Sequence, residues 1–309
     1  MTKTSKTIVF FGSGPVAAKS LELLNKNFTI EAVVTKPRAE HHRGSVPVLE
    51  LAEKLGLKTF LTSNKQDLDK LFATKPVNSE VGIVIDYGII ISKAVIDYFP
   101  FGIVNSHFSL LPQWRGADPI TFSVLSGQKQ TGVSLMLIVE KMDEGPILSC
   151  GVQDLSDIVT TPELTDTLIH LSDALLRDVL PEYLEGKIEG VPQEQAAALI
   201  NQTTEPSYSR KLTKADGIID WQKPAVQLER EIRAFTGWPQ SRTELAGKEV
   251  VITQAHVVDQ TLKPGQTLVE AKQLIIGTGE QSLAIDKLKP AGKAEMTVEG
   301  FLAGYKNKL

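Results

Sequence analysis

Hydrophobic and polar positions in the N-terminal part of the chain alternate in blocks that predict strands and helices in turn. Residues 7–11 form a β-rich run, followed by a glycine turn and a helix whose leucines repeat at helical spacing. Residues 29–35 read as a second strand, and 81–86 as a strand covered on both faces, because that run is continuously apolar. A long amphipathic helix is predicted from Thr161. This succession predicts an α/β domain with a Rossmann-like, doubly wound sheet of mainly parallel strands.

The pattern changes toward the C-terminus, where short β-like runs alternate with Gly and Pro turns after one amphipathic helix at 225–235. Such runs are typical of a small β-barrel or sandwich. The stretch between the two patterns has no clean period and reads as a linker. We therefore predict a first domain at 1–186, a linker at 187–206 and a smaller second domain at 207–309.

Composition is that of an ordinary globular protein: 42% of the 309 residues are hydrophobic and 23% are charged. No run of about eighteen apolar residues occurs, and the N-terminus lacks the apolar core of a signal peptide, so we expect a cytoplasmic protein without a membrane span. The single cysteine, Cys150, excludes an internal disulfide, and without a Cys or His cluster we expect no metal site. A net charge of −4 does not by itself indicate nucleic-acid binding.

The glycine turn after the first strand, Gly12-x-Gly14-x-x-Ala17, fits the dinucleotide-binding fingerprint. That fingerprint has a companion, an acidic residue that ends the second strand and binds the ribose. Here the second strand ends in Thr35-Lys36-Pro37 instead. The missing acidic residue argues against an NAD-dependent dehydrogenase.

Candidate chemistry gathers at the end of a short buried strand, 102–105. Asn105 and His107 are two residues apart, so their side chains point to the same side of an extended chain. An amide donor beside an imidazole suits chemistry at a carbonyl, because one group stabilises an oxyanion and the other moves a proton. A buried, hydrogen-bonded histidine would give the same local pattern, so the pair alone leaves both readings open.

The longer string Asn105-x-His-x-Ser-Leu-Leu-Pro-x-x-Arg-Gly-x-x-Pro119 resembles the signature of the folate-dependent formyltransferases. A second motif, Met142-Asp-x-Gly-x-Ile-Leu148, resembles the family segment whose Asp faces the catalytic His. The resemblance implies 10-formyltetrahydrofolate as co-substrate without a metal, and catalysis by Asn105, His107 and Asp143. It further implies that the folate is bound by Tyr87, Gly88, Ile89, Ser109, Leu110, Leu111 and Pro112.

The C-terminal part resembles the OB-like barrel of the family members that act on tRNA, on two strings, Tyr208-Ser-x-Lys-Leu-x-Lys-x-Asp216 and Leu288-Lys-Pro-Ala-Gly-Lys293. This implies a monomer that formylates the α-amino group of methionyl initiator tRNA, giving N-formylmethionyl-tRNA for translation initiation. The predicted substrate-binding residues are Arg43, Arg115 and Gly116, of which Arg43 would meet a phosphate and Arg115 would anchor its loop or contact an acidic group.

This chain departs from the family pattern at three places. The loop at 36–47 is shorter than usual and lacks its lysines, while Asp86 and Asp118 stand where the family has small residues. Three alternatives therefore stay open: a formyltransferase acting on a nucleotide-sugar amine, a hydrolase of 10-formyltetrahydrofolate, and a non-catalytic RNA-binding protein.

Overall fold

The structure, a computed structural model, describes residues 7–38 and 44–308. Contacts divide the chain into two compact units. The first takes residues up to Pro119, Gln130–Asp154 and Thr165–Ser209; the second takes Ile120–Lys129, Leu155–Leu164 and the chain from Arg210 onward. The predicted boundaries at residues 186 and 207 stay a prediction. Within the described residues, no helix is long and apolar enough to cross a membrane.

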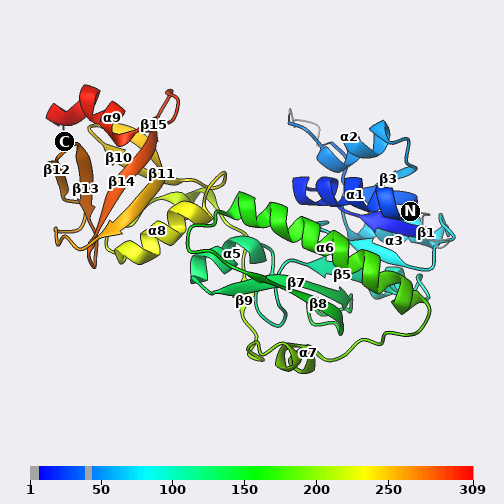
Figure 1. The fold of residues 1–309 in the computed structure, drawn as a ribbon. Coiled ribbons are helices and arrows are strands. Elements are labelled where there is room, and N and C mark those ends of the chain that lie inside the picture. Colours follow the sequence, from blue (N-terminus) through cyan, green and yellow to red (C-terminus); the bar gives the residue numbers. More distant parts are fainter. Residues whose placement is uncertain (1–6, 39–43, 309) are drawn as a thin grey trace. The chain divides into compact units, whose positions relative to one another are not determined.

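The first unit is built on a seven-stranded sheet with the order β3-β2-β1-β4-β5-β7-β8 (Figure 1). The strands from β3 to β5 pair in parallel, whereas β7 and β8 extend the sheet by antiparallel pairing. The predicted Rossmann-like, parallel-dominated fold is confirmed. The strands are β1 (Thr7–Phe11), β2 (Thr29–Thr35), β3 (Thr59–Leu61), β4 (Gly82–Val84), β5 (Ile103–His107), β7 (Gln130–Leu137) and β8 (Ile147–Asp154).

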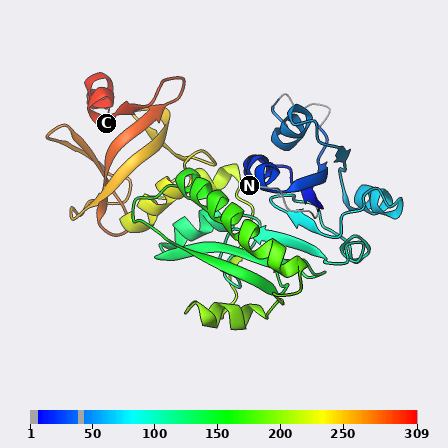
Figure 2. The same ribbon diagram turned by 45° about the vertical axis from the view of Figure 1, so that its right-hand side comes forward.

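Helices cover this sheet, and the long helix α6 lies across the β7–β8 part of it (Figures 1 and 2). Gly151 of β8 allows a close approach, because a Cβ there would lie 2.9 Å from side-chain carbons of Leu171 and Leu175. Ser106 of β5 is also fixed to Ser172 of α6 by a buried 2.6 Å hydrogen bond. The helices of the sheet region are α1 (Pro15–Asn27), α2 (Pro47–Lys54), α3 (Lys65–Ala73), α4 (Lys93–Ile96), α6 (Thr161–Leu184) and α7 (Gln193–Leu199).

Part of the predicted linker is ordered structure. Residues 193–199 form α7, and Ala196 on this helix packs against Leu111, Met136 and Ile147. Beyond it, the two-residue strand β9 (Tyr208–Ser209) pairs in parallel with β6 (Arg115–Gly116). A helix of two turns is too short to show a hydrophobic period, which is why the sequence pattern missed it.

The second unit contains an antiparallel sheet with the order β10-β11-β14-β13-β12, to which β15 adds beside β14. Its core is apolar, with Leu228 and Ile232 from α8 packed with Phe301 from α9 and the inner faces of the strands. The predicted smaller β-domain is confirmed. Its elements are α5 (Pro119–Ser126), η1 (Lys214–Gly217), α8 (Ala225–Ala234), β10 (Ser241–Leu245), β11 (Lys248–Val258), β12 (Thr267–Glu270), β13 (Gln273–Gly277), β14 (Ser282–Pro290), β15 (Met296–Thr297), α9 (Val298–Tyr305) and η2 (Lys306–Lys308).

Candidate functional site

The predicted site residues gather at the carboxyl edge of the parallel strands in the first unit. In a doubly wound sheet ligands bind at this edge, where the strand order reverses, and here the reversal lies between β1 and β4. Val84 of β4 pairs with Asn105 of β5, so the loop that follows β4 begins beside the end of β5. The fold therefore places the candidate chemistry where this architecture binds small molecules.

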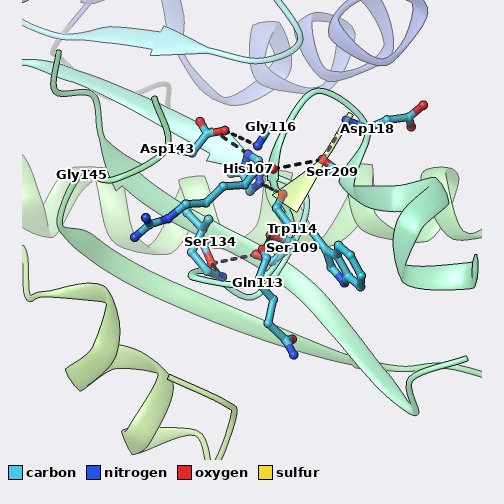
Figure 3. Close-up of polar contacts among 12 residues, drawn as sticks. His107, Ser109, Gln113, Trp114, Gly116, Asp118, Ser134, Asp143, Gly145 and Ser209 are labelled. Carbon is cyan, nitrogen blue, oxygen red and sulfur yellow. Dashed lines mark hydrogen bonds and ion pairs between the residues drawn. The ribbon is translucent and has the colours of Figure 1, made fainter. Parts of the chain in front are cut away.

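His107, the last residue of β5, is buried, with 6% of its surface exposed. Its Nε2 lies 3.0 Å from the carbonyl oxygen of Trp114 (Figure 3). Because a carbonyl oxygen only accepts, Nε2 carries the hydrogen and the neutral ring keeps its lone pair on Nδ1. Nδ1 faces Asp143, at 3.9 Å from Oδ1. The ring is thus held by the backbone on one side and faces a carboxylate on the other.

Asp143 comes from the segment between β7 and β8, far from His107 in sequence. Its Oδ2 accepts a hydrogen bond of 2.7 Å from the backbone N–H of Gly116. Its φ of +53° lies in the left-handed region, which a residue with a side chain adopts when its surroundings hold it there. The structure therefore brings the two predicted motifs together as a pair, His107 and Asp143.

Asn105, the third predicted catalytic residue, is half-buried on the same strand. Its side-chain amide forms no hydrogen bond with any residue that the structure describes. Two N–H donors at the sheet edge are therefore available to an incoming oxygen.

The segment from Trp114 to Asp118 supplies both backbone groups that hold His107 and Asp143, namely the Trp114 carbonyl and the Gly116 N–H. Trp114 has a φ of +55°, so this segment is itself held in an unfavourable conformation. Pairing with β9 helps to hold it, and a Cβ on Gly116 would lie 2.3 Å from the carbonyl oxygen of Ser209. Glycine is required at that position because the two backbones approach so closely.

Two residues near this site had no signal in the sequence. Gln193 on α7 is 3% exposed, and its side chain contacts both loops of the site. Ser207 accepts a 3.0 Å hydrogen bond from Trp114 N–H through its hydroxyl group. Glutamine and serine are common in loops, and both residues reach the site only through tertiary folding, so no spacing rule identifies them.

Of the predicted substrate-binding residues that the structure describes, Arg115 is buried and Gly116 is half-buried. Arg115 is 8% exposed; its guanidinium donates to Gln193 Oε1 (2.7 Å from Nη2) and lies 3.5 Å from a Glu144 oxygen. These bonds anchor the loop. Gly116 donates to Asp143, and Arg43 lies outside the described residues. Substrate binding by each of the three stays a prediction.

The first group of predicted folate residues follows β4. The Tyr87 side chain belongs to the core and shares a buried 2.5 Å hydrogen bond with Thr62, and burial raises the pKa of its hydroxyl to about 12. Gly88 is exposed, with a φ of +65°, and its carbonyl accepts from Lys36 Nζ at 3.2 Å. Ile89 packs partly against the same core. Tyr87 is 2% exposed and its carbonyl oxygen accepts from Ser13 Oγ at 2.9 Å, so of these three residues Gly88 is the exposed one. A folate contact for each of them stays a prediction.

The second group, Ser109 to Pro112, is buried. The carbonyl of Ser109 and the N–H of Leu111 are both bonded to the hydroxyl group of Ser134, at 2.8 and 3.0 Å (Figure 3 draws the Ser109–Ser134 bond). Leu110 and Leu111 are almost fully enclosed. These residues shape the base of the site, and direct folate contact stays a prediction.

Asp86 lies against the glycine turn that resembles a dinucleotide fingerprint. A Cβ on Gly14 would lie only 1.9 Å from Asp86 Oδ2, so the carboxyl group occupies the space over that glycine. Burial of the carboxyl group raises the pKa of Asp86 to about 6, although the residue as a whole keeps contact with water; Lys36 acts to lower it and Asp118 to raise it. Gly12 and Gly14 thus allow the turn after β1 to pack closely against the loop after β4. This close packing explains the glycine pattern without a bound dinucleotide.

Among the described residues, no group of three or more His, Cys, Asp or Glu side chains is placed to hold a metal ion.

Comparisons with known proteins give the same family for both parts of the chain. The family model described as "Formyl transferase" matches residues 5–180, and "Formyl transferase, C-terminal domain" matches 211–306. Among curated relatives, the methionyl-tRNA formyltransferase of Pseudoalteromonas translucida is 36% identical over 307 residues, covering 96% of this chain and 93% of that protein. The methionyl-tRNA formyltransferase of Magnetococcus marinus is 32% identical over 309 residues, covering 98% of this chain and 96% of that protein.

Solved structures with lower identity share the fold. An N-formyltransferase from Helicobacter canadensis, in complex with folinic acid and dTDP-3-aminofucose, gives a TM-score of 0.67 at 16% identity, covering 93% of this chain and all of that chain. HypX from Aquifex aeolicus, in complex with tetrahydrofolic acid, gives a TM-score of 0.62 at 14% identity. This chain is covered to 97% in that match but spans only 47% of HypX.

Proposed function

This chain belongs to the formyl transferase family, and on that premise we propose that it transfers the formyl group of 10-formyltetrahydrofolate to the α-amino group of methionyl initiator tRNA. Family membership makes the chain a formyl-transferring enzyme; the donor and the acceptor are what we propose. Because the acceptor is a substrate of protein synthesis, we expect the enzyme to work in the cytoplasm.

The observation that carries the choice of acceptor is the extent of the similarity. Relatives named methionyl-tRNA formyltransferase align with 96% or more of this chain, and the model of the formyl transferase C-terminal domain matches residues 211–306. The structural neighbour crystallised with an amino-sugar nucleotide is 16% identical and supports the fold alone. The second domain is therefore the best guide to the acceptor.

The side chains fit a formyl donor bound at the sheet edge. The unbonded amide of Asn105 is the group best placed to donate to the formyl oxygen as it gains negative charge. 10-Formyltetrahydrofolate supplies the formyl carbon and, as product, carries a proton on the nitrogen that held the formyl group. The exposed backbone of Gly88 and the side chain of Ile90, which is 66% exposed, offer polar and apolar contacts beside the site.

His107 and Asp143 handle the proton in this proposal. Free α-amino groups titrate at about 7.7–8.0, so a substantial fraction is neutral and able to attack at physiological pH. On attack the new C–N bond leaves a positive charge on the amine nitrogen, which must lose one proton. His107 Nδ1 accepts it, and Asp143 stabilises the charged ring from 3.9 Å. The proton then passes to the folate nitrogen as its bond to the formyl carbon breaks.

The test is formylation of charged initiator tRNA with 10-formyltetrahydrofolate as donor. We expect product with the wild-type chain and a loss of about 10²–10³ in kcat for Asn105→Ala, since one oxyanion donor is removed. The control is Asn78→Ala, a change at an exposed asparagine outside the sheet edge.

Other outcomes have defined meanings. Folate turnover with an amino-sugar nucleotide but not with Met-tRNA would keep the chemistry and replace the acceptor. Turnover without any acceptor would identify a hydrolase. Binding of tRNA with no folate turnover at all would overturn the enzymatic proposal in favour of an RNA-binding protein.

A further inference from the structure

The catalytic pair is held in place by backbone atoms of its loops rather than by a bond between the two side chains. The closest approach of His107 and Asp143, 3.9 Å, exceeds hydrogen-bond length. The hydrogen bond of His107 goes to Trp114 O, and that of Asp143 comes from Gly116 N. The geometry of the pair therefore depends on whatever fixes residues 114–118 and the backbone of Asp143.

Gln193 fixes the backbone of Asp143. Its Nε2 donates to the carbonyl oxygens of Asp143 (2.7 Å) and Gly145 (3.0 Å), while its Oε1 accepts from Arg115 Nε (3.2 Å) and Nη2 (2.7 Å). A glutamine side chain has two donor hydrogens and two acceptor lone pairs, so every one of these groups is used. With 3% exposure, the side chain has no water to replace a lost partner.

Ser207 fixes the other loop. Its hydroxyl oxygen accepts from Trp114 N (3.0 Å), and its carbonyl oxygen accepts from Arg115 N (2.9 Å). Ser209 continues the contact by accepting from Asp118 N at 3.2 Å (Figure 3). The Trp114 peptide, whose carbonyl holds His107, is thereby tied to a segment about ninety residues further along the chain.

We propose that Gln193 and Ser207 are positioning residues for formyl transfer: the segment 193–209 sets the distance and orientation of Asp143 and His107 by bonding to the backbone of both loops. This inference rests on the proposed function, since it assigns the pair to that reaction. The side chains of both residues bond to the two loops, so their effect should fall on the chemical step, because an error of about 1 Å in a catalytic group costs on the order of 10²-fold in rate.

The discriminating change is Gln193→Glu. A carboxylate keeps both acceptors for Arg115 but has no hydrogen to donate to the carbonyls of Asp143 and Gly145. We expect Gln193→Glu and Gln193→Ala to lower kcat by about 10- to 100-fold alike, with KM for both substrates changed by less than about 3-fold. Gln195→Ala, at an exposed glutamine on the same helix, is the control and should behave as the wild type.

Ser207 gives a second, milder test if a Gln193 variant does not fold. Ser207→Thr keeps the hydroxyl acceptor and should retain wild-type kcat, whereas Ser207→Ala should lose about 10-fold. Thr204→Ala, at an exposed position three residues away, is the control.

A readout independent of the acceptor is the imidazole of His107, observed by ¹⁵N NMR of the histidine-labelled full chain. We expect the wild type to show hydrogen on Nε2, and Ser207→Ala to show a mixture of tautomers because the backbone before the Trp114 carbonyl loses its side-chain anchor. This signal stays informative if Met-tRNA proves to be the wrong acceptor. Full kcat with Gln193→Glu, losses confined to KM, or an unchanged tautomer in Ser207→Ala would each overturn the proposal.

Discussion

Two loops at the same edge of the sheet differ in what holds them and in how far their side chains are exposed. In the segment 114–118, the Trp114 carbonyl bonds to His107 and the Gly116 N–H bonds to Asp143, while the Trp114 N–H bonds to Ser207. In the loop that follows β4, the carboxyl group of Asp86 is pressed against Gly14 with a raised pKa, and Ile90 is two-thirds exposed. We infer that the first loop is preorganised for proton transfer and that the second is left open for the ligand.

The largest effect expected from this comparison is at the fixed loop. Asp143→Asn keeps an oxygen for the Gly116 N–H but removes the charge beside His107, so kcat should fall by about 10²–10⁴ with little change in stability. Single-turnover formylation measures the chemical step directly. Asp97→Asn, at an exposed i,i+4 ion pair, is the control. A fall smaller than about 10-fold would mean that the pair does not handle the proton.

An intermediate effect is expected at the open loop. Gly14→Ala places a methyl group against the Asp86 carboxyl, which should cost about 1 kcal/mol of unfolding free energy and raise KM for the folate. The clash is with a side chain, so adding Asp86→Ala should restore both quantities in a double-mutant cycle. Urea denaturation and folate titration measure them. Strictly additive effects would show that the two residues do not meet.

The smallest effect is the pH dependence that Asp86 imposes. Its folded pKa of about 6 lies above the ordinary 3.8, so the native state holds the proton more tightly than the unfolded chain. The ionised carboxylate therefore weakens folding as the pH rises from about 4 through 6. Asp86→Asn should be more stable than the wild type at pH 7.5, by about 1 kcal/mol or less given solvent screening, and equal to it near pH 4. A constant difference between pH 4 and 7.5 would contradict this.

The sequence was most informative where local pattern and chemistry coincide. The apolar run of β4 and the proline that begins α5 follow from rules that act over a few residues. His107 and Asp143 were found because their motifs resemble a known family, and the structure places them together.

What the sequence could not supply depends on distant partners. Gln193 has a role because folding brings two carbonyl groups and a guanidinium to its side-chain amide. These partners are distant in sequence, so the residues around Gln193 do not predict the contacts. The same is true of Asp86, whose pKa depends on the space over Gly14. Such properties depend on tertiary packing, which cannot be read from a single sequence.

The short pairing between β6 and β9 has a consequence for the order in which the enzyme folds during synthesis. A ribosome releases the chain from its N-terminus, so the parallel strands and the side chains of His107 and Asp143 emerge well before Ser207 and Ser209. Until those serines arrive, the segment that holds His107 and Asp143 lacks its partner strand. The first unit should therefore form its sheet first and complete the proposed site later, when residue 209 has left the exit tunnel.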